Sequence, residues 1–339
     1  MSPPLITHLY TADPSAHVFE GKVYIYPSHD RETDIKFNDN GDQYDMADYH
    51  VFSTSKLDPP YAPDSVTDHG VVLRTEDVPW ASKQLWAPDA AFKNGEYYLF
   101  FPARDKEGIF RIGVAVGDSP AGPFKADPEP IPGSFSIDPA SFVDPDTNAG
   151  YLYFGGLWGG QLQCYQETTK KDANGVPAFD AAWTGPQEPS GEGKPALMPK
   201  VAVLSEDMHT FASPAQDLVI LAPETGLPIL ADDHERRFFE AAWMHKRGDK
   251  YYFSYSTGDT HFLVYAIGDS PLGPFTYAGR ILEPVLGWTT HHSIVEFEGR
   301  WWLFHHDCEV SAGVDHLRNV KVTEIFYDDE GRILPVKSA

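Results

Sequence analysis

The stretch AHVFEGKVYIYPS, residues 16–28, decides the fold, because four further segments of the chain repeat its plan. It consists of an apolar strand, a tight turn containing glycine, and a second strand rich in aromatic residues. The other copies are AAFKNGEYYLFFPA (90–103), ASFVDPDTNAGYLYFGG (140–156), AAWMHKRGDKYYFSYS (241–256) and HSIVEFEGRWWLFHH (292–306). Repetition of one hairpin predicts five equivalent structural units.

Further strands follow most of these hairpins, as in FRIGVAVGDS (110–119) and HFLVYAIGDS (261–270). Both continue into nearly identical segments, VGDSPAGPF (116–124) and IGDSPLGPF (267–275), which composition alone does not explain. A hairpin with outer strands, repeated five times, predicts an all-β, five-bladed β-propeller. An irregular β-sandwich is the alternative, but sandwich strands seldom repeat both a turn and its flanking sequence.

We expect residues 1–339 to form a single propeller domain without a C-terminal β-sandwich, because no linker composition separates a second domain. Residues 170–237 depart from the repeat and are rich in Pro, Glu and Asp. They contain the strand-like segment PKVAVLSEDMHTF (199–211). We therefore assign this region to the outer part of the third blade, with long loops.

Composition excludes several classes of partner. The formal net charge is −24, whereas nucleic acid and anionic lipid both require a basic surface. No apolar run has membrane-spanning length, and the start, MSPPLITHLYTADPS, lacks the features of a signal peptide. We therefore expect a cytoplasmic protein, or a secreted one if a signal has been removed. Cys164 and Cys308 are the only cysteines, which excludes a disulfide framework and a thiolate metal site. Oligomeric state stays open.

Aligning the hairpins places polar residues at one equivalent position. Eight residues before Gly21, Gly248 and Gly299 stand Asp13, Glu240 and His291, and the same step from Gly95 reaches Ala87. The third copy has a longer turn, so ADPSAHV (12–18) is aligned with IDPASFV (137–143), which pairs Asp138 with Asp13. In a propeller such positions form a ring at one mouth of the central channel. Taken singly, each could be a turn residue or a structural charge; together they predict an active site.

Three carboxylates without an activated serine or cysteine suit glycoside hydrolysis, which needs an acid and a base or nucleophile. No GxSxG or glycine-rich phosphate motif is present. Glu240 is flanked by Phe238 and Phe239, so desolvation should raise its pKa, as a general acid requires. Asp13 lies in a polar stretch and can stay ionised to deprotonate water. The negative charge of Asp138 should raise the pKa of Glu240 further.

The chain resembles glycoside hydrolase family 43 along essentially its whole length. The resemblance is carried by ADPSAHVF (12–19), WAPD (86–89), SIDPASFVD (136–144), FFEAAW (238–243) and HHSIVEFEGRWWLFHH (291–306). It implies a five-bladed propeller, an inverting mechanism, and activity as a β-xylosidase, α-L-arabinofuranosidase or arabinanase. It also implies Asp13 as general base, Glu240 as general acid and Asp138 as the carboxylate that tunes and orients the acid.

The resemblance extends to substrate and metal contacts. It implies Trp86 as an apolar wall for a sugar ring, and Asp30 and Arg318 as polar contacts to substrate hydroxyls. Many family members hold a hydrated divalent cation, often calcium, on a histidine of the fifth blade; His291 matches that position and His292 is the alternative. A single imidazole is an unusual calcium ligand, because calcium prefers several oxygens, so the cation is expected from the resemblance alone.

The predicted function is exo-acting, inverting release of pentosyl units from xylo-oligosaccharides or arabinoxylan fragments. β-Xylosidase is the first choice, with α-L-arabinofuranosidase activity beside it. An endo-arabinanase, a related hydrolase of other sugars, and a non-catalytic carbohydrate-binding propeller are the alternatives. Residues 30–45 and the insertion in the third blade are expected to close the pocket, which favours attack on chain ends.

Overall fold

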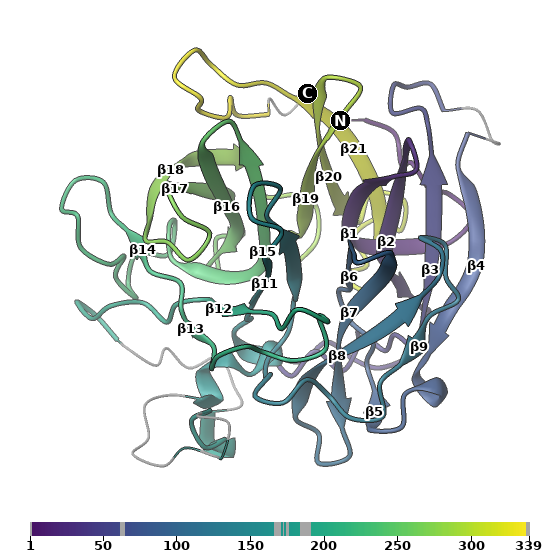
Figure 1. Ribbon diagram of the computed structural model, residues 1–339, viewed down its shortest axis with the longest axis horizontal. Helices are drawn as coiled ribbons and strands as arrows, with labels where there is room; N and C mark the ends of the chain where they lie inside the picture. The colour runs from purple at the N-terminus through teal and green to yellow at the C-terminus, as the bar shows by residue number, and fades with distance from the viewer. Residues whose placement is uncertain are drawn as a thin grey trace.

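The structure, a computed structural model, describes residues 2–61, 65–165, 171, 173, 176–183 and 191–336. Within these residues the strands form five sheets arranged around a central axis (Figure 1). The architecture is the predicted five-bladed β-propeller. The only helices of the described residues are short 3₁₀ turns: η1 (Thr75–Asp77), η2 (Trp158–Gly160), η3 (Leu162–Tyr165) and η4 (Ala181–Trp183).

Each blade contains one of the repeated hairpins, whose first strand is the innermost of the blade. Blade one contains β1 (Tyr10–Phe19), β2 (Lys22–Asp30), β3 (Asp48–Thr54) and β4 (Thr67–Arg74); blade two contains β5 (Ala81–Lys83), β6 (Asp89–Lys93), β7 (Glu96–Asp105), β8 (Phe110–Gly117) and β9 (Lys125–Ala126). Blade three contains β10 (Ala140–Val143), β11 (Gly150–Phe154), β12 (Lys200–Val203) and β13 (Gln216–Asp217). Blade four contains β14 (Ile220–Leu221), β15 (Phe238–Arg247), β16 (Lys250–Thr257), β17 (Leu263–Gly268) and β18 (Phe275–Leu282); blade five contains β19 (His292–Phe297), β20 (Arg300–Asp307) and β21 (Asn319–Ile325).

The assignment of residues 170–237 needs one correction. Strands β12 and β13 extend blade three, as predicted. Strand β14, however, pairs in parallel with β18, with Ile220 opposite Phe275, and so forms the outer edge of blade four. A two-residue strand carries no periodicity that could have revealed this pairing.

The two near-identical segments occupy equivalent places, between β8 and β9 and between β17 and β18. Gly122 (φ 69°) and Gly273 (φ 74°) adopt the left-handed conformation in these turns, which glycine adopts without strain. Each turn delivers a buried phenylalanine, Phe124 or Phe275, to the hydrophobic core. The sequence repeat is therefore a repeat of one turn and one packing contact.

The innermost strands β1, β6, β10, β15 and β19 contact one another in sequence around the axis. A closed circle of hydrogen bonds joins each blade to the next. The bonds run from Ser15 Oγ to Pro88 O (2.8 Å), Ser141 N to Asp89 Oδ2 (2.5 Å), Ala241 N to Asp138 Oδ2 (2.8 Å), Trp243 Nε1 to Ile294 O (3.0 Å) and Ala16 N to Ser293 Oγ (3.0 Å). These hydrogen bonds fix the positions of the five innermost strands along the propeller axis. They thereby fix the positions of the side chains at the mouth of the central channel.

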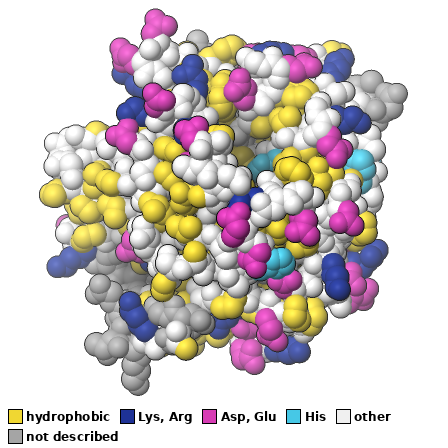
Figure 2. All heavy atoms as spheres, viewed as in Figure 1, with side chains coloured by type: hydrophobic (Ala, Val, Ile, Leu, Met, Phe, Trp, Pro, Cys, Tyr) yellow, Lys and Arg dark blue, Asp and Glu magenta, His cyan; other side chains and the backbone are white. Residues whose placement is uncertain are grey.

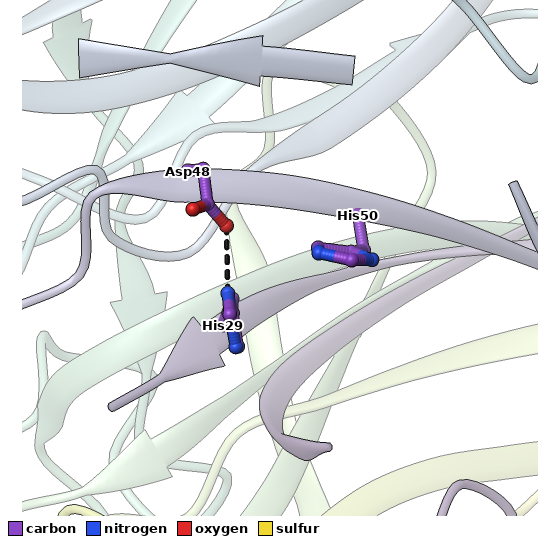
Figure 3. A group of neighbouring side chains, drawn as sticks. All are labelled: His29, Asp48 and His50. Carbon is purple, nitrogen blue, oxygen red and sulfur yellow. Dashed lines mark hydrogen bonds and ion pairs between the residues drawn. The ribbon is translucent and has the colours of Figure 1, made fainter. Parts of the chain in front are cut away.

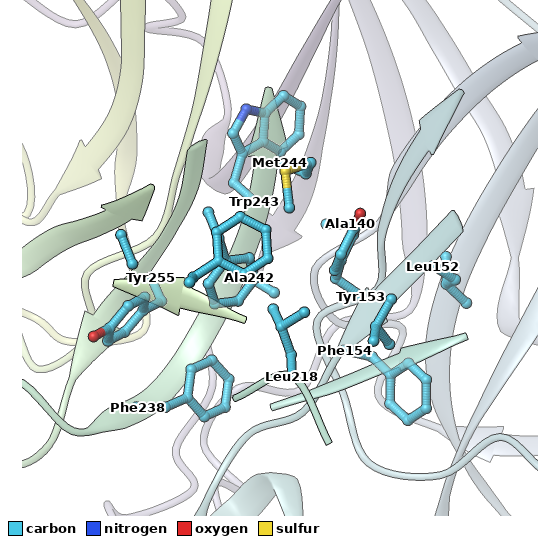
Figure 4. Packing of buried hydrophobic residues seen from close by; sticks show 14 of the residues in the cluster. Ala140, Leu152, Tyr153, Phe154, Leu218, Phe238, Ala242, Trp243, Met244 and Tyr255 are labelled. Atoms are coloured by element: carbon cyan, nitrogen blue, oxygen red, sulfur yellow. The ribbon is translucent and has the colours of Figure 1, made fainter. Parts of the chain in front are cut away.

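Apolar side chains fill the space between neighbouring blades. Figure 4 shows this packing between blades three and four, where Tyr153 and Phe154 of β11 lie near Phe238 and Trp243 of β15. A separate cluster joins blade one to blade five, with Ile25 and Phe52 packed near Phe304. Burial of these faces is what holds the blades together.

The N-terminal segment lies beside the last strand of blade five and helps to close the ring. Leu5 donates its N–H to the carbonyl of Val320 (2.8 Å), and Thr11 donates to that of Arg318 (2.8 Å). This pairing brings the start of β1, which carries Asp13, next to Arg318 of blade five. Closure of the fold therefore places the guanidinium group of Arg318 beside the carboxylate of Asp13.

On the face drawn in Figure 2, acidic and basic side chains are interspersed and no continuous basic surface is visible. In the part of the chain that the structure describes, no helix has the length and apolar character to cross a bilayer.

Candidate active site

All five ring positions line a single pocket. Asp13, Ala87, Asp138, Glu240 and His291 come from five blades, and all five lie in the lining of this pocket. The hairpin alignment thus located residues more than 250 positions apart in the sequence, from Asp13 to His291, in one cavity.

Irregular backbone turns these side chains toward the pocket. The pairing of β1 with β2 shifts register between Ala12 and Ser15, and β15 shifts on both sides of Glu240. Asp13 (φ 48°), Asp138 (φ 56°) and Ala241 (φ 62°) have positive φ, which strains a residue other than glycine. A β-bulge re-aims a side chain that a regular strand would send into the sheet. Strained backbone at the ring position of blades one and three, and one residue after it in blade four, is typical of a functional site.

Hydrogen bonds hold the strained backbone. The Asp13 N–H donates to His306 Nδ1 at 2.9 Å, so that nitrogen carries no proton. His306 Nε2 lies 3.1 Å from the carbonyl of Thr289 and therefore carries the ring's proton. Burial, with the charge of Arg318, lowers the pKa of His306 to about 3, which keeps the ring neutral. The neutral tautomer with its proton on Nε2 is the form of His306 that accepts the Asp13 N–H and so fixes the Asp13 backbone.

Asp13 is held as a carboxylate. Its Oδ1 accepts a hydrogen bond from Arg318 Nη1 (2.9 Å) and its Oδ2 accepts one from Ser28 Oγ (2.7 Å). Burial alone would raise its pKa, but the adjacent charge of Arg318, together with the hydrogen bond from Ser28, lowers it to about 2. Asp13 is therefore ionised throughout the neutral and mildly acidic range.

The pKa values of Glu240 and Asp138 are raised, whereas that of Asp13 is lowered. Burial, followed by the charges of Asp138 and Asp13, raises the pKa of Glu240 well above its usual value. Burial also raises the pKa of Asp138, to about 6, against the influence of His291 and of the hydrogen bond from the Ala241 N–H. One pocket thus holds a permanently ionised carboxylate and a carboxyl group that keeps its proton, which is the arrangement that acid–base chemistry requires.

Arg318 and Asp30 form a buried pair, and only Arg318 faces the pocket. Arg318 Nε and Nη2 donate to the two oxygens of Asp30 at 2.8 Å each, and the Arg318 N–H donates to Oδ2 at 2.9 Å. Asp30 is 3% exposed and is absent from the pocket lining. It orients the guanidinium that binds Asp13, so a contact between Asp30 and substrate finds no support in this geometry.

Trp86 lines the pocket and is firmly held. Its Nε1 donates to the carbonyl of Tyr44 (2.8 Å), and its carbonyl accepts from Tyr49 Oη (2.5 Å). A Cβ added to Gly41 would lie 2.6 Å from the Trp86 ring, so the loop can approach this side chain only because residue 41 is glycine. The indole is positioned as a rigid apolar wall.

Besides Tyr44, three neighbouring aromatic side chains at the pocket were not predicted from the sequence. Phe37, Trp158 and Trp288 line it, with Trp288 5.8 Å from the ring of Trp158 and 5.9 Å from that of Phe37. Trp288 stands three residues before His291, in LGWTTHH, and Trp158 stands between glycines in LWGG. A tryptophan in a loop next to a ring position is the signal that could have identified them.

The loops that wall the pocket match the expectation in part. Residues 37–44 of the predicted segment 30–45 contribute, with Met46 just beyond it, and the third blade contributes Leu157–Gly160. That segment precedes the insertion at 170–237, and no described residue of the insertion lines the pocket. The prediction that the insertion closes the pocket is therefore wrong for its described residues.

His291 is the ring position at which the family resemblance predicts a cation. Its Nδ1 lies 3.7 Å from Asp13 Oδ1 and 3.7 Å from Asp138 Oδ2. One imidazole nitrogen cannot satisfy calcium, but carboxylates on either side can accept hydrogen bonds from water ligands, so the donor set fits a hydrated divalent cation. His292 does not fit, because it is fully buried outside the pocket lining with Nε2 2.6 Å from Ser254 Oγ.

Comparison with known proteins gives consistent matches. The model of glycosyl hydrolases family 43 matches residues 6–187. Xylosidase/arabinosidase 43A of Humicola insolens is 74% identical over 334 residues, with 98% of this chain and 99% of that protein covered. The crystal structure of CoXyl43, a GH43 beta-xylosidase/alpha-arabinofuranosidase from a compost microbial metagenome, in complex with xylotriose and in calcium-free form, is 56% identical, with a TM-score of 0.89 and 99% and 97% of the two chains covered. The GH43_1 enzyme from Xanthomonas citri, complexed with xylotriose, is 51% identical, with a TM-score of 0.87 and coverage of 99% and 93%.

Proposed function

The chain belongs to glycosyl hydrolase family 43, and from this premise we propose that it is an exo-acting, inverting hydrolase that releases pentosyl units from xylo-oligosaccharides or arabinoxylan fragments. We assign β-xylosidase as its main activity and α-L-arabinofuranosidase activity beside it. The observation that carries the proposal is that Asp13 and Glu240 line one pocket, in surroundings that lower the pKa of Asp13 and raise that of Glu240.

Asp13 acts as the general base. Its carboxylate is ionised and held from both oxygens by Arg318 and Ser28. It removes a proton from a water molecule as the water oxygen bonds to the anomeric carbon. Because water attacks from the face opposite the leaving group, the released sugar has the inverted configuration.

Glu240 acts as the general acid and gives its proton to the glycosidic oxygen as the carbon–oxygen bond breaks. Asp138 supports it in two ways. Its negative charge raises the pKa of Glu240, and its Oδ2 accepts a hydrogen bond from the N–H of Ala241, which fixes the backbone that carries Glu240. Asp138 is a positioning and tuning residue in this scheme.

Action on chain ends follows from the walls of the pocket. Loops from blade one (residues 37–46), from blade three (157–160) and between blades four and five (288–289) surround the carboxylates. A pocket bounded in this way accepts a terminal sugar more readily than the middle of a polymer. Trp86 supplies the apolar face against which a sugar ring packs, and Arg318 and Thr289 supply polar groups at the lining.

The substrate assignment is tested with nitrophenyl β-D-xylopyranoside and nitrophenyl α-L-arabinofuranoside. We expect both to be hydrolysed, because the two pentosyl units present similar hydroxyl groups to one pocket. The assignment of β-xylosidase as the main activity predicts the larger kcat/KM for the xyloside. NMR spectroscopy of the hydrolysis of nitrophenyl β-D-xylopyranoside, which releases a single xylose, should show α-xylose before mutarotation. Initial release of β-xylose would contradict inversion, and oligosaccharide products from debranched arabinan would favour an endo-arabinanase.

We further propose that His291 holds a hydrated calcium ion, which when bound would supply positive charge and ordered water beside Asp13 and Asp138. The support is the position of Nδ1, 3.7 Å from each carboxylate. Exhaustive chelation is expected to lower kcat/KM on the order of tenfold, and calcium to restore it. The His291→Ala enzyme should respond to neither treatment. Elemental analysis must confirm removal of the ion, and an unchanged rate in metal-free wild-type enzyme would contradict the proposal.

A further inference from the structure

Two histidines and an aspartate form a cluster on blade one that is distinct from the pocket. His29, near the end of β2, and Asp48 and His50, on β3, converge as shown in Figure 3. Their side chains are 17%, 21% and 14% exposed, so they are reachable from solvent but largely enclosed. None of the three lines the active-site pocket.

The ligand atoms are close enough to share one ion. Each residue offers one nitrogen or oxygen atom, and these three atoms lie within 4.8 Å of one another. Zinc–nitrogen bonds near 2.1 Å place tetrahedral ligand atoms roughly 3.4 Å apart, so modest side-chain rotations would suffice. His29 Nδ1 lies 2.6 Å from Asp48 Oδ1.

A second carboxylate prepares His50 to bind an ion. His50 Nδ1 lies 3.0 Å from Oδ1 of Asp68, which also accepts the N–H of Gly70 at 2.7 Å. Because an ionised carboxylate can only accept, His50 Nδ1 carries the proton and Nε2 keeps its lone pair. Histidine ligands of metals are commonly oriented by a carboxylate in this way. The second oxygen of Asp68 is held by His8 Nε2 at 2.9 Å.

We propose that His29, Asp48 and His50 bind a borderline transition-metal ion of the zinc class, with water completing the coordination. Two imidazole groups and one carboxylate suit zinc, cobalt or nickel, whereas calcium requires more oxygen ligands. With Asp48 and Asp68 both ionised, the cluster also carries the negative charge that attracts a cation.

The position of the cluster gives the ion a structural role. His29 and Asp48 stand at the two ends of the chain segment 30–47, whose residues 37–46 wall the active-site pocket. Asp30, which orients Arg318, directly follows His29. An ion bound by both ends would hold this loop closed at its base, where an ion pair between Arg31 and Asp45 (2.7 Å) already joins it.

Calorimetric titration with zinc chloride tests the proposal. The chain of residues 1–339 is used after chelation, in a His291→Ala background that removes the other expected metal site. We expect one zinc ion per chain. His50→Gln should weaken the affinity at least tenfold, and Asp68→Asn should weaken it about 10- to 100-fold, the range found for residues that orient metal ligands.

The matched control is His209→Gln. His209 forms an equivalent pair with Asp127 (2.6 Å) outside the cluster, so its loss should leave zinc binding unchanged. Cobalt should give visible absorption bands in the parent protein that His50→Gln abolishes, and zinc should raise the Tm of the parent but not of that variant. Equal zinc affinity in the parent and His50→Gln, or no binding to the folded parent, would overturn the proposal.

Discussion

Replacement of Asp13 by asparagine is expected to reduce kcat by about a thousandfold or more, with little change in the affinity for xylose. The substituted side chain keeps the size of aspartate and can still accept a hydrogen bond from Ser28, so the pocket should persist. It cannot accept the proton of the attacking water, and general base catalysis contributes on the order of 10² to 10⁴ in rate. Steady-state kinetics with nitrophenyl xyloside and calorimetry with xylose measure the two effects.

Two further variants separate loss of the base from loss of structure. Asp13→Ala leaves space for azide, an anion that attacks without a base, so azide should restore part of the rate and yield an α-xylosyl azide. Asp144→Asn is the matched control, because Asp144 is likewise buried and accepts a hydrogen bond from Tyr251 (2.8 Å) but lies outside the pocket. Full activity in Asp13→Asn would refute its role as base.

The fold was predictable because its repeats are visible in the sequence. A strand–turn–strand pattern with glycine at the turn requires only local information, and five copies imply a closed ring. What escaped prediction depends on contacts between distant segments. The two residues of β14 join blade four only through parallel pairing with β18, and nothing in Ile220 or Leu221 specifies that partner.

In the pocket too, features encoded in the repeats were predictable, and features that depend on contacts between distant segments were not. Its ring residues followed from alignment of the hairpins, because equivalent strand starts meet at one mouth. The role of Asp30 did not, because only the closure of blade five against blade one brings Arg318 to it. The aromatic wall of Phe37, Trp158 and Trp288 is built from three loops whose relative positions no repeat determines.

Replacement of Glu240 by glutamine should produce a loss that depends on the leaving group. Glutamine cannot donate the proton that a poor leaving group needs, so xylobiose cleavage should fall on the order of 10² to 10⁴. Dinitrophenyl xyloside has a leaving group that departs without protonation, and its hydrolysis should fall far less. A steep dependence of rate on the pKa of the leaving group, shallow in wild type, is the expected signature, and equal losses for all substrates would contradict the role of acid.

The pH profile distinguishes Glu240 from Asp138. The pKa of Glu240 is raised, so the carboxyl group is protonated at neutral pH and the rate for xylobiose should fall as the pH rises through that pKa. Part of this elevation comes from the charge of Asp138. In Asp138→Asn that charge is gone while the side-chain oxygen can still accept the Ala241 N–H, so the alkaline limb should move to lower pH. In Glu240→Gln the limb should vanish altogether. An alkaline limb that stays in place in Glu240→Gln would mean that another group, and not Glu240, delivers the proton.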